Sequence, residues 1–167
     1  MKKILIIGIS GTGKSHLAHR LSEQTGIPTT HCDDIAWKSG WIAEDPAIVS
    51  RKLQKVLDKN TWIIEGYIAP LASERVNQAD LIIYLDFPGY LALLGGITRW
   101  WMYRGKERPG VQPGNKEDLP LMNFWSMLTR KERSEIEAAL KKCHKKTIRL
   151  TSWKAANNFV LPGVDNR

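Results

Sequence analysis

The residues at positions 8–15, GISGTGKS, have the types and spacing that bind phosphate groups. They fit the pattern G-x-x-x-x-G-K-[ST], in which backbone N–H groups surround phosphate oxygens and the following helix adds partial positive charge. Lys14 would bridge the β- and γ-phosphates, and the Ser15 hydroxyl would be a ligand of Mg²⁺. Gly11 and Gly13 would allow a close approach that a Cβ atom blocks. The pattern predicts ATP and Mg²⁺ as cofactors, with ATP contacted by Gly8, Ile9, Ser10, Gly11, Thr12, Gly13, Lys14, Ser15 and His16.

A carboxylate beside that magnesium is expected at the end of a neighbouring buried strand. Glu65 in TWIIEGY meets this expectation and is the predicted second metal ligand, next to Ser15. The alternative is a strand-terminal glutamate in solvent. Asp86 in LIIYLD is another candidate carboxylate, but Pro88 follows at once and opens the next helix. Asp86 is therefore expected to cap a helix or anchor a lid.

The segment HCDDIAWKSGW, residues 31–41, follows the second expected strand and is the predicted acceptor site. Asp33 could orient an acceptor hydroxyl, accept its proton late in the transfer, or hold Mg²⁺ through water. Trp37 and Trp41 could form a wall of the pocket, since aromatic rings stack on planar or sugar-like substrates. The alternatives are core packing for the tryptophans and a solvated turn for the aspartate. His31 is more typical of a structural histidine than of a catalytic one.

Arginines are expected near the transferred phosphate because its negative charge spreads over three oxygens. Arg99, Arg104 and Arg108 flank a glycine- and proline-rich segment, and Arg104 and Arg108 are the predicted catalytic pair. Arg99 and Arg104 are five residues apart and need not share a helix face, so one of them could be a solvated residue or an ion-pair partner. Arg75 either binds an anionic group of the acceptor or is a surface arginine.

Short apolar runs alternate with amphipathic stretches, which predicts βαβ units around a parallel sheet. Every strand is apolar enough to predict burial on both faces. Asp45 before Pro46 indicates a helix start, and Gly26 indicates a helix end. The expected strands are 3–7, 28–32, 62–65, 81–85 and 147–150, and the expected helices are 14–24, 46–59, 70–77, 90–103, 121–142 and 153–160.

Residues 105–120, GKERPGVQPGNKEDLP, contain three glycines, three prolines and six charged residues, which predicts a loop. A segment of this length without secondary structure is usually either a functional lid or disordered, and the basic flank favours a lid. We therefore expect residues 99–120 to form a short basic lid.

With 167 residues, 43% of them apolar, and seven tryptophans, the chain is expected to form one globular domain over residues 1–167. The longest uncharged apolar stretch, FPGYLALLGGIT, is too short to span a membrane, and the N-terminal run is too short for an export signal. Two distant cysteines, Cys32 and Cys143, fit neither a disulfide framework nor a zinc site. We expect a cytoplasmic protein that makes no membrane contact.

The net charge of +8 lies almost entirely between Arg99 and Arg149, a segment that contains 13 basic and 6 acidic residues. Anionic partners are expected to meet that part of the protein. Phosphate-rich small molecules and nucleic acid both have the required charge, and net charge alone does not separate them.

Taken together, these residues resemble the P-loop kinases related to adenylate kinase, and more closely the DNA topology modulation protein (FlaR-like) family, over nearly the whole chain. Adenylate kinases carry Asp-Gly where this chain has Glu65-Gly66. The chain departs from the family at Tyr67-Ile68, where Asn-Tyr is usual, and at Gly89, where Arg is usual. The matching elements are H-x-D-x-x-x-W at His31, Asp33 and Trp37, W-I-I-[DE]-G at 62–66, Arg75, L-D-x-P at 85–88, and Y-R-G-x-x-R-P at 103–109.

The resemblance implies an α/β P-loop NTPase fold of the nucleoside- and adenylate-kinase type, with a five-stranded parallel sheet flanked by helices, ATP with Mg²⁺, and a kinase-like site. Both departures fall near the expected acceptor site, so the resemblance does not identify the acceptor. The expected substrate-binding residues are Asp33, Trp37, Gly66 and Arg75, and the expected catalytic residues are Lys14, Asp33, Arg104 and Arg108.

Three functions are consistent with these features. The favoured one is an ATP-dependent phosphotransferase, acting as a monomer or weak dimer on a small-molecule or nucleotide acceptor. The second is a regulatory ATPase affecting DNA topology, in which Trp100, Trp101 and Tyr103 contact stacked bases; nucleic acid is the less favoured partner. The third is a nucleotide-binding interaction module that has lost catalysis. DNA binding with a steep salt dependence would favour the second.

Overall fold

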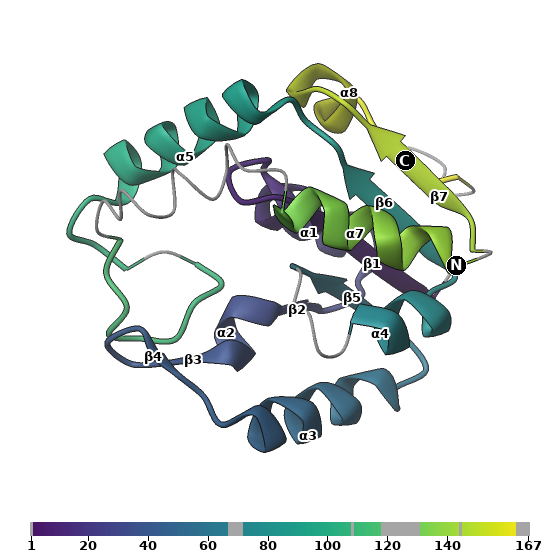
Figure 1. The fold of residues 1–167 in the computed structure, drawn as a ribbon, viewed down its shortest axis with the longest axis horizontal. Helices are drawn as coiled ribbons and strands as arrows, with labels where there is room; N and C mark the ends of the chain where they lie inside the picture. The colour runs from purple at the N-terminus through teal and green to yellow at the C-terminus, as the bar shows by residue number, and fades with distance from the viewer. Residues whose placement is uncertain (1, 67–71, 108, 118–130, 144, 163–167) are drawn as a thin grey trace.

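The computed structural model describes residues 2–66, 72–107, 109–117, 131–143 and 145–162. Its centre is a five-stranded parallel sheet in the order β2-β5-β1-β6-β7 (Figure 1). This confirms the predicted five-stranded parallel sheet. The strands are β1 Lys3–Gly8, β2 Thr29–His31, β5 Trp62–Glu65, β6 Leu81–Leu85 and β7 Thr147–Leu150.

Helices cover both faces of the sheet because side chains of the central strands alternate between the two faces. On one face, Leu5 and Ile7 of β1 pack in a core with residues of α3, α4 and α7. On the other face, Ile4 and Ile6 pack with residues of α1 and α8. The helices are α1 Lys14–Thr25, α2 Cys32–Ala36, α3 Pro46–Leu57, α4 Ala72–Gln78, α5 Gly89–Tyr103, α7 Lys131–Lys141 and α8 Trp153–Asn157.

The burial of the strands differs from the prediction at the two edges of the sheet. β1, β5 and β6 are almost entirely buried, as expected. β2 is only half-buried, and in β7 Thr147 and Arg149 are exposed. The prediction of burial on both faces is therefore wrong for β2 and β7, because a strand that ends the sheet has one neighbour fewer to cover it.

The expected helix boundaries hold where a side chain or glycine specifies them. The Asp45 carboxylate accepts a hydrogen bond of 2.7 Å from the backbone N–H of Ala47, with Pro46 as the first helical residue. Gly26 ends α1 at φ 70°, and its N–H donates to the Ser22 carbonyl. The sequence did not predict α2, in which Cys32 begins a helix instead of ending a strand. Residues 70–71 and 121–130 of two expected helices lie outside the described residues.

A small antiparallel hairpin stands apart from the main sheet and was not predicted. It pairs β3, Trp37–Lys38, with β4, Ile42–Ala43. The expected loop after α5 packs against it: the Trp41 backbone N–H donates to Asn115 Oδ1 at 2.7 Å, and the Trp41 indole donates to the Lys116 carbonyl at 2.8 Å. Bridges between Arg104 and Glu117 and between Glu107 and Lys116 close the described part of this loop.

Within the described ranges, no helix combines the length and the apolar character needed to cross a membrane.

Candidate active site

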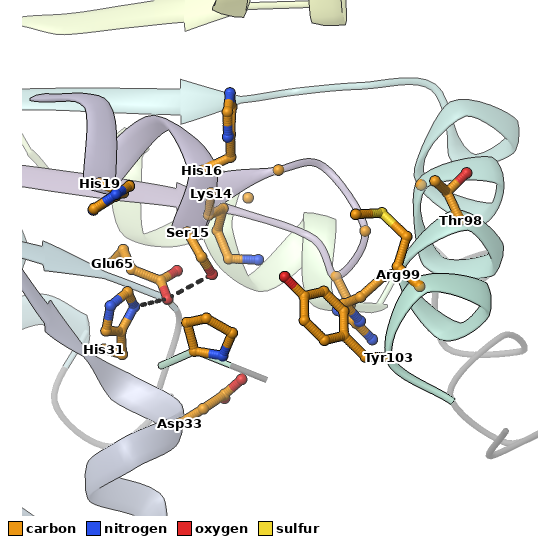
Figure 2. A pocket seen from close by; sticks show the side chains of 18 of the residues that line it. Lys14, Ser15, His16, His19, His31, Asp33, Glu65, Thr98, Arg99 and Tyr103 are labelled. Carbon is orange, nitrogen blue, oxygen red and sulfur yellow. Dashed lines mark hydrogen bonds and ion pairs between the residues drawn. The ribbon is translucent and has the colours of Figure 1, made fainter. Parts of the chain in front are cut away.

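A cavity of about 800 Å³ opens where β1, β5 and β2 end (Figure 2). The glycine loop after β1 forms one wall, and α5 forms the wall across from the ends of β2 and β5. Of the nine residues predicted to contact ATP, seven line the cavity: Gly8, Ser10, Gly11, Gly13, Lys14, Ser15 and His16. The other two, Ile9 and Thr12, are buried inside the loop.

Hydrogen bonds to one carbonyl hold the glycine loop in its curved shape. The Ile9 carbonyl accepts from the Thr12 hydroxyl at 2.9 Å and from Lys14 Nζ at 3.0 Å. Gly13 has φ 85° and open space where a Cβ atom would stand, so its left-handed backbone is what requires glycine.

Gly11 is required for a reason that the sequence did not indicate, in addition to the predicted close approach to phosphate, which stays a prediction. A Cβ atom there would lie 2.0 Å from the Ala92 carbonyl oxygen of α5, and a Cβ atom on Gly95 would lie 2.0 Å from the Gly11 carbonyl oxygen. The loop and α5 therefore pack backbone against backbone. Gly11 serves this helix contact, whereas the sequence had suggested only close approach to phosphate.

Glu65, at the end of β5, is a buried residue at the centre of a partly buried hydrogen-bond network. Its Oε1 atom accepts from the Ser15 hydroxyl at 3.0 Å and is 2.7 Å from His31 Nδ1 (Figure 2). Burial raises the pKa of Glu65, but the His31 hydrogen bond, the Lys14 charge and the Ser15 hydrogen bond outweigh it and lower the pKa below its ordinary value. Glu65 is therefore an ionised, buried carboxylate, and the alternative of a solvated glutamate is wrong.

This donor set fits magnesium. A carboxylate beside a serine hydroxyl, at the N-terminus of α1, supplies the hard oxygen ligands that Mg²⁺ prefers. Among the described residues, no group of three His, Cys, Asp or Glu side chains could hold a metal without help. Mg²⁺ usually takes one or two protein oxygens and completes its shell with water and nucleotide phosphates. Ser15 and Glu65 would hold the ion in that way.

The predicted acceptor residues divide between the cavity and its surroundings. Asp33, in the first turn of α2, lines the cavity, as does Gly66 directly after β5. Trp37 is not a lining residue; it makes an edge-to-face contact with Trp41, with ring centroids 5.9 Å apart, inside the hairpin. Trp37 is half-buried and belongs to neither hydrophobic core, so it forms neither the predicted cavity wall nor the core packing that was the alternative.

Arg75 is fully buried, so the surface alternative is wrong for it. Its guanidinium donates to the Gly66 carbonyl at 2.8 Å and to Cys32 Sγ at 3.0 Å. It does not line the cavity. Cys32 is equally buried, and this burial, only partly offset by the Arg75 charge, raises the pKa of its thiol to about 11. Arg75 therefore stabilises the cavity wall at Gly66 without lining the cavity itself.

The arginine that α5 directs into the cavity is Arg99, whereas the sequence had favoured Arg104 and Arg108. Arg99 donates to Glu117 at 2.7 Å and reaches the Ser10 hydroxyl at 3.4 Å. Arg104 is exposed, with its guanidinium 5.3 Å from the centre of the Trp100 ring, and Arg108 lies outside the described residues.

The helical spacing of residues in α5 distinguishes Arg99 from Arg104. Its cavity-facing residues recur at helical spacing, at Gly95, Thr98, Arg99 and Met102, and Tyr103 also lines the cavity (Figure 2). Of its exposed large apolar residues, Tyr90, Leu94, Ile97 and Trp101 do not line the cavity, whereas Met102 does. Arg104 does not belong to the cavity-facing row.

Asp86, the alternative metal ligand, does not line the cavity. It forms ion pairs with Arg133 of α7 at 2.8 Å and with Arg149 of β7 at 2.9 Å. Asp86 therefore connects α7 and β7, and these ion-pair partners do not belong to the predicted lid, so the predicted role of capping a helix or anchoring a lid is wrong. The N-cap position of α5 belongs to Pro88.

No protein-family model matches the chain, and no curated protein matches it by sequence. Several solved structures match its fold. A shikimate kinase from Acinetobacter baumannii in complex with shikimate is 20% identical, with a TM-score of 0.55 over 94% of this chain and 88% of that one. A deoxyadenosine kinase from M. mycoides with bound dATP is 16% identical, with a TM-score of 0.55 over 96% and 93%. A shikimate kinase from Aquifex aeolicus is 19% identical, with a TM-score of 0.52 over 92% and 89%.

At these identities the likeness defines the fold. The chain has the fold of the P-loop kinases of the adenylate-kinase type, and the glycine loop follows β1 as that fold requires. The closer resemblance to DNA topology modulation proteins is not confirmed by the comparisons and stays a prediction.

Proposed function

We propose that this protein is an ATP-dependent phosphotransferase that phosphorylates a hydroxyl group of a small molecule. The observation that carries the proposal is the placement of Lys14, Ser15, Glu65 and Asp33 around one cavity. A nucleotide-binding loop alone would serve many functions. A carboxylate across the same cavity from the loop adds a group that could position an acceptor.

ATP would lie with its phosphates on the glycine loop. Mg²⁺, held by Ser15 and Glu65, would neutralise charge on the β- and γ-phosphates. Lys14, whose amine now contacts the Ile9 carbonyl, would turn toward those phosphates. Thr98, Met102 and Trp153 line the cavity as well and offer apolar area to a planar base.

The chain's own groups would then act on the acceptor. Asp33 would accept a hydrogen bond from the acceptor hydroxyl, hold its oxygen in line with the γ-phosphorus, and take up its proton as the new bond forms. Arg99, in the last turns of α5, would stabilise the charge that develops on the transferred group. Arg108 stays a proposed further cation, and Arg104, exposed over Trp100, would contribute little. The two cysteines are free, which suits the proposed location in the cytoplasm.

The second candidate, a regulatory ATPase on DNA, depends on aromatic residues that would have to form one surface. Tyr103 faces the cavity, Trp100 packs under Arg104, and Trp101 is exposed. Trp100 and Trp101 contact each other edge to face, with ring centroids 6.3 Å apart, whereas Tyr103 lines the cavity, so the structure offers less support to this candidate than to phosphotransfer.

The experiment that tests the proposal is ADP release by the full chain with Mg²⁺ and ATP, with and without candidate acceptors. We expect acceptor-dependent ADP release that Lys14→Ala nearly abolishes while the thermal midpoint stays close to that of the parent protein. Asp33→Asn should lower kcat strongly and leave ATP affinity unchanged. Slow hydrolysis unaffected by any acceptor, or stimulated only by DNA, would contradict the proposal.

A further inference from the structure

Trp41, in the turn of the β3-β4 hairpin, has a backbone conformation that favours glycine. Its φ of 56° lies in the left-handed region, and within the described ranges every other residue with a positive φ is a glycine. The preceding residue, Gly40, is one of them, with φ 76°. A bulky side chain in this region is strained and persists only where surrounding contacts hold it. The contacts of Trp41 therefore indicate what the tryptophan does that a glycine would not.

Those contacts attach the loop after α5 to the hairpin. The Trp41 indole N–H donates to the Lys116 carbonyl at 2.8 Å, and the Trp41 backbone N–H donates to Oδ1 of the fully buried Asn115 at 2.7 Å. Nearby, the Gln112 side chain donates to the Asp34 carbonyl of α2 at 3.0 Å. The loop is thus held against the elements that follow β2 by three hydrogen bonds.

Glu117, the next residue along the loop, connects this attachment to the cavity. Its buried carboxylate accepts a hydrogen bond of 2.7 Å from Arg99 Nε. The carbonyl that accepts the Trp41 hydrogen bond belongs to the peptide group of Glu117. Losing that hydrogen bond would therefore free the backbone that positions the Glu117 carboxylate.

The pairing with Glu117 sets the orientation of the Arg99 guanidinium. Arg99 extends from α5 into the cavity (Figure 2). Its Nε atom is engaged by Glu117, while its Nη1 atom reaches the Ser10 hydroxyl of the glycine loop at 3.4 Å. The donors of a guanidinium form a rigid planar fork, so fixing Nε also fixes the direction of the terminal nitrogens. Here those nitrogens are directed toward the loop proposed to hold the phosphates.

Resting on the proposed function, we propose that Trp41 is a positioning residue for phosphoryl transfer: through the peptide group of Glu117 it holds the Arg99 guanidinium toward the transferred phosphate. Trp41 itself does not line the cavity, so it acts through Arg99. The hairpin directly follows α2, the helix that carries Asp33. The proposed acceptor residue and the catalytic arginine are therefore both attached to the unit formed by α2 and the hairpin.

The first measurement is hydrogen exchange of the Arg99 Nε–H group, followed by heteronuclear NMR on the isotope-labelled full chain without nucleotide. Arg99→Gln identifies the resonance by removing it. Trp41→Phe keeps an aromatic ring but lacks the indole N–H, and we expect exchange at least about threefold faster because the hydrogen bond to Glu117 opens more often. Trp41→Gly should also speed the exchange while keeping the thermal midpoint, since glycine relieves the strained backbone. Ile42→Ala, at an exposed residue of the same hairpin, is the matched control and should leave the exchange rate unchanged.

The second measurement is the single-turnover rate of phosphate transfer in a double-mutant cycle. Trp41→Phe should lower this rate by about 10- to 100-fold in the parent protein, because a small misplacement of a catalytic group has effects of that size. In the Arg99→Gln background the same substitution should lower the rate by less than about twofold, because the group that Trp41 positions is already absent.

The two measurements separate this inference from the function on which it rests. Equal losses of rate in both backgrounds, or an Arg99 Nε–H exchange rate that Trp41→Phe leaves unchanged, would overturn the inference and leave the phosphotransferase proposal standing. If no acceptor supports phosphate transfer, the phosphotransferase proposal is contradicted instead, and the exchange measurement alone decides whether Trp41 positions Arg99.

Discussion

The imidazole of His31 connects the loop after α5 to the buried carboxylate of Glu65. His31 Nδ1 lies 2.7 Å from Glu65 Oε1, and Gly110 packs so closely on the imidazole that a Cβ atom there would lie 2.9 Å from both His31 Cγ and Nδ1. A chain of contacts thus runs from the loop, through the histidine, to the oxygen that also accepts the Ser15 hydrogen bond.

Replacing His31 should weaken magnesium binding without removing a ligand. His31→Phe deletes the hydrogen bond that orients Glu65, and partners of metal ligands are typically worth about 10- to 100-fold in metal affinity. We expect the Mg²⁺ concentration for half-maximal ADP release to rise by about tenfold. His31→Asn, which keeps a polar group near the carboxylate, should recover part of the loss. An unchanged Mg²⁺ requirement in His31→Phe would show that the contact is only structural.

Gly110→Ala should disturb the site through His31. Both Gly110 and Gly105 have positive φ, 84° and 68°, so alanine is strained at either position by roughly 1 kcal/mol. Only at Gly110 would the new methyl group meet the histidine ring, because the space around Gly105 is open. We therefore expect Gly110→Ala to lower kcat/KM several-fold more than Gly105→Ala, measured by ADP release. Equal effects of the two substitutions would contradict this reasoning.

Arg99 should matter more for the chemical step than Arg104. Arginines that stabilise a transferring phosphoryl group contribute about 10³-fold or more to kcat. We expect a loss approaching that size in Arg99→Gln and less than about threefold in Arg104→Gln, since Arg104 is exposed over Trp100. Single-turnover measurement of phosphate transfer would isolate the step. Because Arg99 also pairs with buried Glu117, the thermal midpoints of both variants serve as the control for folding.

Glu44 connects the hairpin to α3 through ion pairs with Lys38 and Lys52, and these ion pairs should be lost at low pH. Hydrogen bonds from Lys38 and Lys52 hold the pKa of Glu44 at about 2. A carboxyl group with a folded pKa below its unfolded value stabilises the fold above the unfolded pKa, and this contribution disappears as pH falls through the folded value. The urea midpoint should therefore fall from about pH 4.5 toward pH 2 with a steeper slope in the parent protein than in Glu44→Gln. If the urea midpoints of the parent protein and of Glu44→Gln fell in parallel with pH at low salt, the lowered pKa of Glu44 would be contradicted.

The glycine loop, the three central strands and Glu65 could be predicted because local pattern determines them. A continuous apolar run followed by G-x-x-x-x-G-K-S specifies a strand, a turn and a helix within thirteen residues. Glu65 could be predicted in the same way, because a carboxylate that ends a buried apolar strand must lie at the carboxyl edge of the sheet. The edge strands were predicted in position but not in burial, because exposure depends on which strand ends the sheet.

The features that the sequence did not reveal depend on contacts between distant segments. Trp37 faces Trp41 in a hairpin only two residues deep, and the hairpin is covered by residues more than seventy positions away. Arg75 is buried because Gly66 and Cys32 offer acceptors to its guanidinium, and neither neighbour is adjacent in sequence. Charge and exposure of such residues are set by tertiary structure, so residue type alone could not assign their roles.

The backbone contact between Gly11 and Ala92 has a consequence for how the glycine loop would change over evolutionary time. A lineage that ceased to transfer phosphate would still need glycine at position 11, because any side chain there would force α5 away from the loop. Retention of glycine at position 11 would therefore reflect the packing of α5 against the loop, whether or not a nucleotide binds. The side chains of Lys14 and Ser15 face the cavity, so a lineage that lost phosphate chemistry should accumulate substitutions at these two positions first.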